Sequence, residues 1–375
     1  MLADTLQGYR VLDLSQYLPG PYATRLLADL GADVVKVEPP DGDPMRTFAF
    51  LDDDGLSPLY KQINAGKTVV RLDLKSESGH ARFTELLRVA DVLLESYRPG
   101  VMARLGFSLS HLHSLNPRLV HCALSGFGQD GPSSQRAGHD LTYLALSGML
   151  SHTGTTAIPV IPFPPVADYA GGQQAANLIL AALLRRGRYD EGCYIDTSLF
   201  ETVLSWQSLG QAGIGRPGQE LLPGQGVLNG GLACYQIYQT ADQKFVVLGA
   251  LEKKFWQAFC ATVGHSEWVA RQDEQMPQTA LINELRELFV SASRDSWVDL
   301  LARTDCCFEP LLAPEEVVKH PHVMYRQMVE PAQGEALPAD IRFPARMDGR
   351  APCQRRPLRE TPVETVASDW LVGTE

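Results

Sequence analysis

Two residues of this sequence, His139 and Asp168, have the types and the settings that proton transfer requires. Each lies beside an apparent helix start, in the stretches 138–140 and 168–172. The proline-rich connector at 159–165 is long enough to fold back on itself. A histidine and a carboxylate placed around one substrate carbon could remove a proton from it and return one.

The same two residues also have ordinary structural explanations. A single histidine is more often structural than catalytic, and an aspartate ahead of a helical run is usually an N-cap. Asp168 fits that pattern, because residues 173–184 read as a helix that ends in the basic stretch 185–187. Spacing alone favours the structural interpretation, so the chemical one needs support from the rest of the chain.

Length and charge limit the classes of function. A chain of 375 residues exceeds what one core usually supports, which predicts two domains or one elaborated domain. The composition, 45% hydrophobic and 21% charged, is that of a soluble globular protein. The net charge of -11 argues against nucleic acid and anionic membranes as partners. An anionic ligand would need a local cluster of lysine and arginine.

The cysteines and histidines do not form a metal-ligand pattern. The seven cysteines are scattered and include no C-x-x-C pair, so neither a zinc site nor a disulfide framework is indicated. His320 and His322 flank a proline in an expected loop, and without an evident third ligand we interpret them as structural. No metal is predicted. The first residues lack a signal peptide and no apolar run approaches a membrane span, so we expect a cytoplasmic protein.

Strand-like and helix-like segments alternate over the first half of the chain. The strand-like segments are 10–14, 32–38, 68–75, 91–97, 119–125 and 192–196. This alternation predicts an α/β fold with an open doubly wound, Rossmann-like sheet, whose ligand crevice lies beyond the carboxyl ends of the strands. The loop after the first strand lacks G-x-G-x-x-G, so a dinucleotide cofactor is not indicated.

A change of composition divides the chain. Residues 215–231 are rich in glycine and predict a linker or a mobile flap. Residues 232–319 predict a smaller α+β domain with a hairpin and three amphipathic helices. Residues 1–214 and 320–375 would form the large domain.

Four basic residues fall just past strands or at loop edges, namely Lys67, Lys75, Arg98 and Arg104. Each alone could be a solvated surface charge. Together they are the best candidate cluster for an anionic ligand on an acidic protein.

Several blocks resemble the family III CoA-transferase superfamily (CaiB/BaiF type), which also contains the 2-methylacyl-CoA racemases. The blocks are 8–14, 19–21, 27–39, 72–75, 97–100, 315–316 and 320–322. The resemblance extends over essentially the whole length of the chain, and the superfamily shares these blocks whatever the activity of its members.

The central blocks separate the activities. Residues 137–148 resemble the racemase pattern, in which the histidine is one of two bases and where transferases typically carry an aromatic residue. Residues 167–172 match the aspartate motif of both groups, and 247–252 resemble the segment whose glutamate supports the racemase histidine. The chain departs from the racemases at Lys253, where they commonly have proline, and 38–46 resemble the transferase branch. The balance favours the racemase branch.

This resemblance implies epimerisation of the alpha carbon of a 2-methylacyl-CoA through an enolate. Neutral His139 would remove the proton, protonated Asp168 would supply one to the opposite face, and Glu252 would orient His139. A helix N-terminus favours the carboxylate form, so burial must raise the pKa of Asp168. The same helix start could offer N–H groups to the enolate oxygen. The thioester supports the enolate, so no cofactor is expected and CoA enters as part of the substrate.

Two alternatives remain open on the sequence. In a family III CoA-transferase, Asp168 would be a nucleophile that forms an acyl anhydride and then an aspartyl-CoA thioester, and His139 would be incidental. A non-catalytic acyl-CoA-binding or scaffolding protein is the other class.

The resemblance also implies an assembly and a CoA site. It predicts an interlocked homodimer, with His139 and Asp168 on the large domain of one subunit and Glu252 on the small domain of the other. The acyl-CoA thioester would be held by Leu72, Asp73, Leu74, Lys75, Arg98, Arg104 and Gly138.

Overall fold

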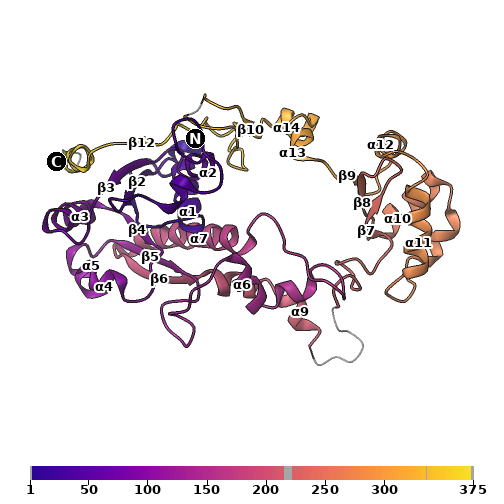
Figure 1. Cartoon of the computed structure of the whole chain (residues 1–375), viewed down its shortest axis with the longest axis horizontal. Coiled ribbons are helices and arrows are strands. Elements are labelled where there is room, and N and C mark those ends of the chain that lie inside the picture. The colour runs from indigo at the N-terminus through magenta and orange to yellow at the C-terminus, as the bar shows by residue number, and fades with distance from the viewer. Residues whose placement is uncertain (1, 215–221, 335, 373–375) are drawn as a thin grey trace. The chain divides into compact units, whose positions relative to one another are not determined.

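The chain divides into two compact units. The computed structural model describes residues 2–214, 222–334 and 336–372 (Figure 1). Unit 1 comprises Met1–Ser147, Phe163–Trp206 and His320–Glu375, and unit 2 comprises Gly148–Pro162 and Gln207–Lys319. The predicted linker falls partly on 215–221, which lie outside the described residues, and 222–231 form turns.

Unit 1 is built on a parallel seven-stranded sheet. Its strands are β1 (Arg10–Asp13), β2 (Asp33–Glu38), β3 (Thr68–Arg71), β4 (Val92–Glu95), β5 (Val120–Ser125), β6 (Cys193–Ser198) and β12 (Arg359–Glu360). Their order is β12-β3-β2-β1-β4-β5-β6, and every pairing is parallel. All residues of β4 and β5 are buried, as expected for strands with covered faces. The predicted α/β class is confirmed, and the strand order reverses between β1 and β4.

Helices connect the strands of unit 1. They are α1 (Pro19–Asp29), α2 (Pro58–Ile63), α3 (Glu77–Val89), α4 (Val101–Arg104), α5 (Leu109–Leu115), α6 (Asp140–Leu146), α7 (Val166–Tyr189), α8 (Leu199–Ser205), α14 (Pro321–Arg326) and α15 (Val363–Val372). The long helix α7 packs along α1 and against α6 and α8, whereas α3 packs against α5 and α15 (Figure 1). Short 3-10 turns, η1 (Leu2–Asp4) and η2 (Pro44–Thr47), and the strand pair β10 (Val329–Glu330) and β11 (Asp340–Ile341) complete the unit.

The helix starts have local causes, and the start of α7 differs from the prediction. Helix α1 begins at Pro19, because proline lacks an N–H that the first turn would leave unbonded. Helix α7 begins at Val166, so Asp168 is its third residue and not its N-cap, a position that Pro165 occupies. Two helices follow β6, namely α8 in unit 1 and α9 (Ser208–Ala212) in unit 2.

Unit 2 combines a small antiparallel sheet with helices. The sheet has the order β7 (Tyr235–Gln239), β8 (Phe245–Gly249) and β9 (Phe308–Pro310). The other elements are η3 (Met149–His152), η4 (Ser266–Arg271), α10 (Lys253–Val263), α11 (Thr279–Phe289), α12 (Arg294–Leu301) and α13 (Pro314–Val317). Its core is aromatic, with Tyr238, Trp256, Phe259 and Phe289 fully buried. Among the described residues, no helix is long and apolar enough to cross a membrane.

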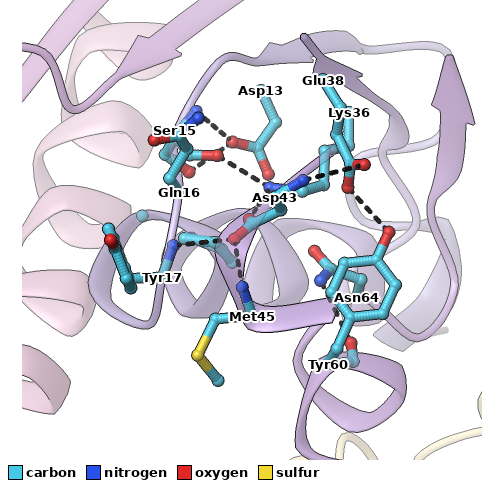
Figure 2. A network of polar contacts seen from close by, with 12 residues as sticks. Asp13, Ser15, Gln16, Tyr17, Lys36, Glu38, Asp43, Met45, Tyr60 and Asn64 are labelled. Atoms are coloured by element: carbon cyan, nitrogen blue, oxygen red, sulfur yellow. Dashed lines mark hydrogen bonds and ion pairs between the residues drawn. The ribbon is translucent and has the colours of Figure 1, made fainter. Parts of the chain in front are cut away.

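A buried polar network lies at the end of β1 (Figure 2). Asp13 Oδ2 pairs with Lys67 Nζ at 3.1 Å, and Lys36 Nζ pairs with Asp43 Oδ2 at 2.9 Å. Burial alone would raise the pKa of the Asp13 carboxyl, but the Lys67 and Lys36 cations outweigh it and hold that pKa well below its usual range. The network therefore contains two positive and two negative side chains, which form two ion pairs.

The same network fixes the loop between β1 and α1. Lys36 Nζ donates to the Ser15 carbonyl at 2.7 Å, and the Tyr17 N–H donates to Asp43 Oδ1 at 3.3 Å (Figure 2). Tyr17 has φ 62°, in the left-handed region that non-glycine residues rarely adopt. The buried ion pair thus holds Tyr17 in a conformation that the loop alone would disfavour.

Lys67 is a correction to the predicted basic cluster. Its side chain is fully buried, and its ammonium also donates to the Pro21 carbonyl at 2.8 Å and to Asn64 Oδ1 at 2.9 Å. Burial lowers the pKa of Lys67 to about 8, although Asp13 opposes the shift. Lys67 is therefore part of the core and is not available to an anionic ligand.

The block 38–46, which resembles the transferase branch, also serves the core. Glu38 accepts hydrogen bonds from Tyr60 Oη at 2.7 Å, Arg46 Nε at 2.6 Å and the Asp43 N–H at 3.2 Å. These side chains are structural here, so the block carries little weight in choosing between reactions.

Candidate active site

A cavity of about 360 Å³ in unit 1 is lined by both His139 and Asp168. The loops after three strands contribute to its wall, with Gln16 and Tyr17 after β1, Ser96, Tyr97 and Arg98 after β4, and Gly126 after β5. The cavity therefore lies at the carboxyl ends of the strands, where the strand order reverses. The structure thus brings together the two residues that the sequence selected for proton transfer.

His139 is exposed and directly precedes helix α6. Its N–H donates to Thr142 Oγ1 at 3.0 Å, and its carbonyl accepts from the Thr142 hydroxyl at 2.7 Å. The Tyr17 ring meets the imidazole edge-on, with ring centroids 6.4 Å apart. Because the buried network fixes Tyr17, that network reaches the candidate site through one aromatic contact.

Gly138 and Gly126 make room for Tyr143. A Cβ on Gly138 would lie 2.7 Å from Tyr143 Cε1, and one on Gly126 would lie 2.5 Å from Tyr143 Oη. Tyr143 is buried, and burial raises its pKa to about 12, so the phenol is neutral at ordinary pH. Tyr143 also lines the cavity. The sequence interpretation gave it no role, and its place four residues after His139 was the available signal.

Asp168 has the environment of a carboxylic acid. Burial, and secondly the negative charge of Asp140, raise its pKa to about 7. No cation and no hydrogen bond from the described residues contributes to that pKa. The shift opposes the dipole of α7, which would favour the carboxylate. Its direction is the one that proton donation near neutral pH requires.

Asp140 occupies the N–H groups at the start of α7. Its Oδ1 accepts from the Ala167 N–H at 2.6 Å and from the Asp168 N–H at 3.2 Å. The expectation that this helix start donates to an enolate oxygen is wrong for these two groups, because each already has a partner. Sequence reasoning assigned no function to Asp140.

A second cavity of unit 1, of about 510 Å³, contains part of the predicted CoA site. Leu74, Lys75 and Arg104 line it together with His80 and the first residues of α3. Arg98 and Gly138 line the other cavity, with His139. Leu72 is buried and lines neither cavity. Asp73 accepts the Lys75 N–H at 3.0 Å and so shapes the loop.

Glu252 belongs to unit 2. It is exposed and immediately precedes helix α10, without a side-chain hydrogen bond to the helix. Its support of His139 stays a prediction of the resemblance. The described residues contain no group of three or more histidine, cysteine or acidic side chains placed to hold a metal. The side chain of His320 caps α14, in agreement with its structural interpretation.

Comparison with protein families matches residues 6–360 to the family described as CoA-transferase family III. The chain belongs to CoA-transferase family III. This family III protein is 35% identical to the alpha-methylacyl-CoA racemase of Homo sapiens over 320 residues, 84% of this chain and 80% of the relative. It is 31% identical to the acetyl-CoA:oxalate CoA-transferase of Acetobacter aceti over 370 residues, 93% of this chain and 91% of the relative.

A solved structure supports the same assignment. The family III protein has a TM-score of 0.83 and 25% identity to the crystal structure of a CaiB/BaiF family protein from Brucella suis, covering 97% of this chain and 99% of that chain. Its relatives include a racemase and a transferase. Family membership therefore supports an acyl-CoA enzyme and leaves the choice of reaction to the chemistry of the site.

Proposed function

We propose that this family III protein racemises the alpha carbon of a 2-methylacyl-CoA by proton transfer between His139 and Asp168. The observation that carries the proposal is the pair itself: both residues line one cavity, and Asp168 has a pKa raised to about 7. The similarity to the human alpha-methylacyl-CoA racemase agrees with it.

The proposed reaction needs two opposed acid–base groups. His139, neutral, takes the alpha proton, and the electron pair of the C–H bond moves into the enolate, whose charge rests on the thioester oxygen. Protonated Asp168 then gives a proton to the opposite face of the same carbon. In the other direction the Asp168 carboxylate removes the proton and the imidazolium of His139 returns one, so no oxidant or reductant is consumed.

The state of Asp168 favours this reaction over transfer between acids. A nucleophilic carboxylate must be ionised, and a neighbouring cation would promote that state. Here the charge that acts on Asp168 is the negative one of Asp140, and burial raises the pKa of Asp168 in the same direction. Transfer chemistry also gives no task to His139, which lines the same cavity.

We place the nucleotide end of CoA at the second cavity. Lys75 and Arg104 line it, and neither forms an ion pair within the described residues. Two free cations on a protein of net charge -11 are suited to anionic phosphates. Arg98, at the other cavity, would meet the part of CoA that lies closer to the thioester.

By resemblance, we extend the proposal to an interlocked homodimer in which Glu252 of the partner subunit supports His139. Co-expression of a His139→Ala chain with a Glu252→Ala chain tests it. A shared site predicts that the mixed dimer regains one intact site and part of the activity. Activity that stays at the level of the single variants would contradict a shared site.

Alpha-proton exchange tests the reaction. One epimer of a 2-methylacyl-CoA is incubated with the protein in deuterated water without an acceptor acid, and mass and chirality are followed. We expect deuterium uptake together with loss of chirality. As a matched control, His111→Asn changes an exposed histidine of α5 and should leave the rate unchanged.

The transfer reaction predicts a different result. A covalent acyl or CoA adduct at Asp168, trapped with hydroxylamine, together with no deuterium uptake on several acyl groups, would overturn the racemase proposal and favour a CoA-transferase.

A further inference from the structure

One carboxylate joins the two elements of the candidate site. Asp140 is the first residue of α6, directly after His139, and its Oδ1 accepts the N–H groups of Ala167 and Asp168 in the first turn of α7. The bond to Ala167 is 2.6 Å long, which is short for a nitrogen donor and typical of a charged acceptor. Among the described residues, none of those that line the cavity bridges these two helix starts in this way.

We propose that Asp140 is the positioning residue of this site, which fixes the spacing of His139 and Asp168 and keeps the Asp168 carboxyl uncharged. The inference rests on the proposed function, because it assigns Asp140 to the same proton transfer. Asp140 itself need not touch the substrate.

The effect of Asp140 on the spacing of His139 and Asp168 follows from the geometry. His139 precedes Asp140 without an intervening residue, and its backbone is fixed on the other side by Thr142. Helices α6 and α7 also pack against each other. A shift of either helix start would break the Asp140 hydrogen bonds. Asp140 therefore couples the position of His139 to that of Asp168. Proton transfer depends steeply on such spacing.

The effect of Asp140 on the charge of Asp168 follows from the different partners of their two carboxyl groups. Burial raises the pKa of Asp140, but its two N–H donors stabilise the carboxylate and oppose the shift. Burial also raises the pKa of Asp168, and there the charge of Asp140 adds to the shift. When two neighbouring carboxyls share one negative charge, the better solvated one holds it. The charge therefore resides on Asp140 and the proton on Asp168.

Other ionisable groups surround Asp168, and none of them replaces Asp140 in this role. Those that line the same cavity are Tyr17, Tyr97, Arg98, Arg136, His139 and Tyr143. The further elements packed on α7 carry Arg25 on α1, Glu201 on α8, His121 on β5 and Asp196 on β6. Among the described charged groups, Asp140 is the one whose charge raises the pKa of Asp168.

The variant Asp140→Asn separates charge from shape, because asparagine keeps the size and an acceptor oxygen. Its first readout is independent of activity. In protein labelled with ¹³C at the aspartate carboxyls, the Asp168 signal is assigned by its loss in Asp168→Asn and is titrated. We expect a midpoint near the pKa of about 7 in the wild type, and a midpoint lower by roughly one pH unit or more in Asp140→Asn.

The matched control is Asp196→Asn. Asp196 also accepts a backbone N–H, that of Gln129 at 3.1 Å, but it lies on β6 and does not line the cavity. It should leave the Asp168 midpoint unchanged. An unchanged midpoint in Asp140→Asn would overturn the proposal. Asp140→Ser, which also keeps a neutral acceptor, gives the same test if the asparagine variant does not fold.

The second readout is alpha-proton exchange. At pH 8 a downward shift of one unit reduces the protonated fraction of Asp168 about ten-fold, so we expect exchange with inversion of the alpha carbon to fall to roughly a tenth in Asp140→Asn, with KM nearly unchanged. Exchange with retained chirality, which needs His139 alone, should persist. The two readouts also distinguish a failure of the proposed function from a failure of the role of Asp140. The absence of any exchange in the wild type would contradict the proposed function, whereas a normal rate of exchange with inversion in Asp140→Asn at pH 8 would contradict the role of Asp140 alone.

Discussion

Two carboxyl groups of unit 1 lose contact with water, Asp13 completely and Asp168 in part, and their pKa values move in opposite directions. Asp13 has two lysine ammonium groups and two hydroxyl donors around it, and they overcome the effect of burial. Asp168 has a second carboxyl, Asp140, as its neighbour, so the effect of burial is reinforced. Burial therefore makes a carboxyl sensitive to its partners, and the sign of the partner decides its charge.

The two regions consequently serve different purposes. In the network of Figure 2 the charges are paired and fully buried, and their hydrogen bonds hold the loop that carries Tyr17. In the cavity, Asp168 lines an open volume, and among the described residues no cation lowers its pKa. The first arrangement fixes a shape, and the second leaves a proton available. Tyr17, edge-on to His139, is where the two regions meet.

The largest effect should come from removing the cavity carboxyl. Asp168→Asn takes away one of the two acid–base groups, and such groups contribute about 10²- to 10⁴-fold to rates. We expect loss of racemisation by at least that factor, measured by chirality of the recovered acyl group. Asp190→Asn, an exposed residue that ends α7, is the control. If Asp168→Asn racemised at nearly the wild-type rate, Asp168 would not be an acid–base group of the reaction, and its role would no longer differ from the structural one of Asp13.

The network should respond in stability. Lys36→Met leaves Asp43 buried without its cation, and breaking such a pair costs about 3–5 kcal/mol. The free energy of unfolding, measured by urea denaturation, should fall by that amount. Replacing Asp43 by asparagine as well removes the unpaired charge and keeps an oxygen that can accept the Tyr17 and Met45 N–H groups, so Lys36→Met with Asp43→Asn should recover part of the loss. Arg82→Met, at a surface pair with Glu85, should leave the free energy of unfolding nearly unchanged, because solvent screens exposed pairs. A Lys36→Met protein of wild-type stability would contradict the structural role.

Sequence reasoning succeeded where a residue's local pattern determined its place. The alternation of apolar strands with helices identified the parallel sheet, and the stretches around His139 and Asp168 identified residues that do line one cavity. It failed where the outcome depended on distant partners. Lys67 read as a surface charge, because nothing near it in the chain shows that Asp13 would bury it. Asp140 read as part of a motif, because its donors lie 27 and 28 residues away.

Lys75 and Lys67 differ in the same way, and the difference can be tested by ligand binding. Lys75 is exposed beside the second cavity, whereas Lys67 is buried and paired. Lys75→Met should raise KM for an acyl-CoA about ten-fold, since a charge-assisted hydrogen bond contributes about 1.5–3 kcal/mol, and should leave stability unchanged. Lys67→Met should lower stability. Arg88→Met, on the exposed part of α3, is the control for KM. An unchanged KM in Lys75→Met would exclude the second cavity as the nucleotide site.

The smallest expected effect is a difference in how stability depends on pH. Folding raises the pKa of Asp168 from 3.8 to about 7, so the folded state binds a proton more tightly and loses stability as pH rises through that window. Asp168→Asn removes this loss and should be more stable than wild type by about 1–2 kcal/mol at pH 8. The advantage should vanish near pH 4. Asp13, whose pKa is lowered, loses its contribution on acidification instead.

If the advantage of Asp168→Asn in thermal or urea unfolding were equal at pH 4 and pH 8, the raised pKa of Asp168 would be contradicted. The measurement at pH 4 is the control for the measurement at pH 8, because any effect of asparagine on packing is common to both.

The central claim, two acid–base groups on opposite faces of one carbon, is tested most directly by epimer-specific exchange in single variants. Each variant, Asp168→Asn and His139→Asn, is given each epimer of a 2-methylacyl-CoA in deuterated water. The account predicts a reciprocal pattern: Asp168→Asn exchanges the proton of one epimer with retained chirality, and His139→Asn does so only with the other. Exchange of the same epimer by both variants, or of neither epimer by either one, would contradict it.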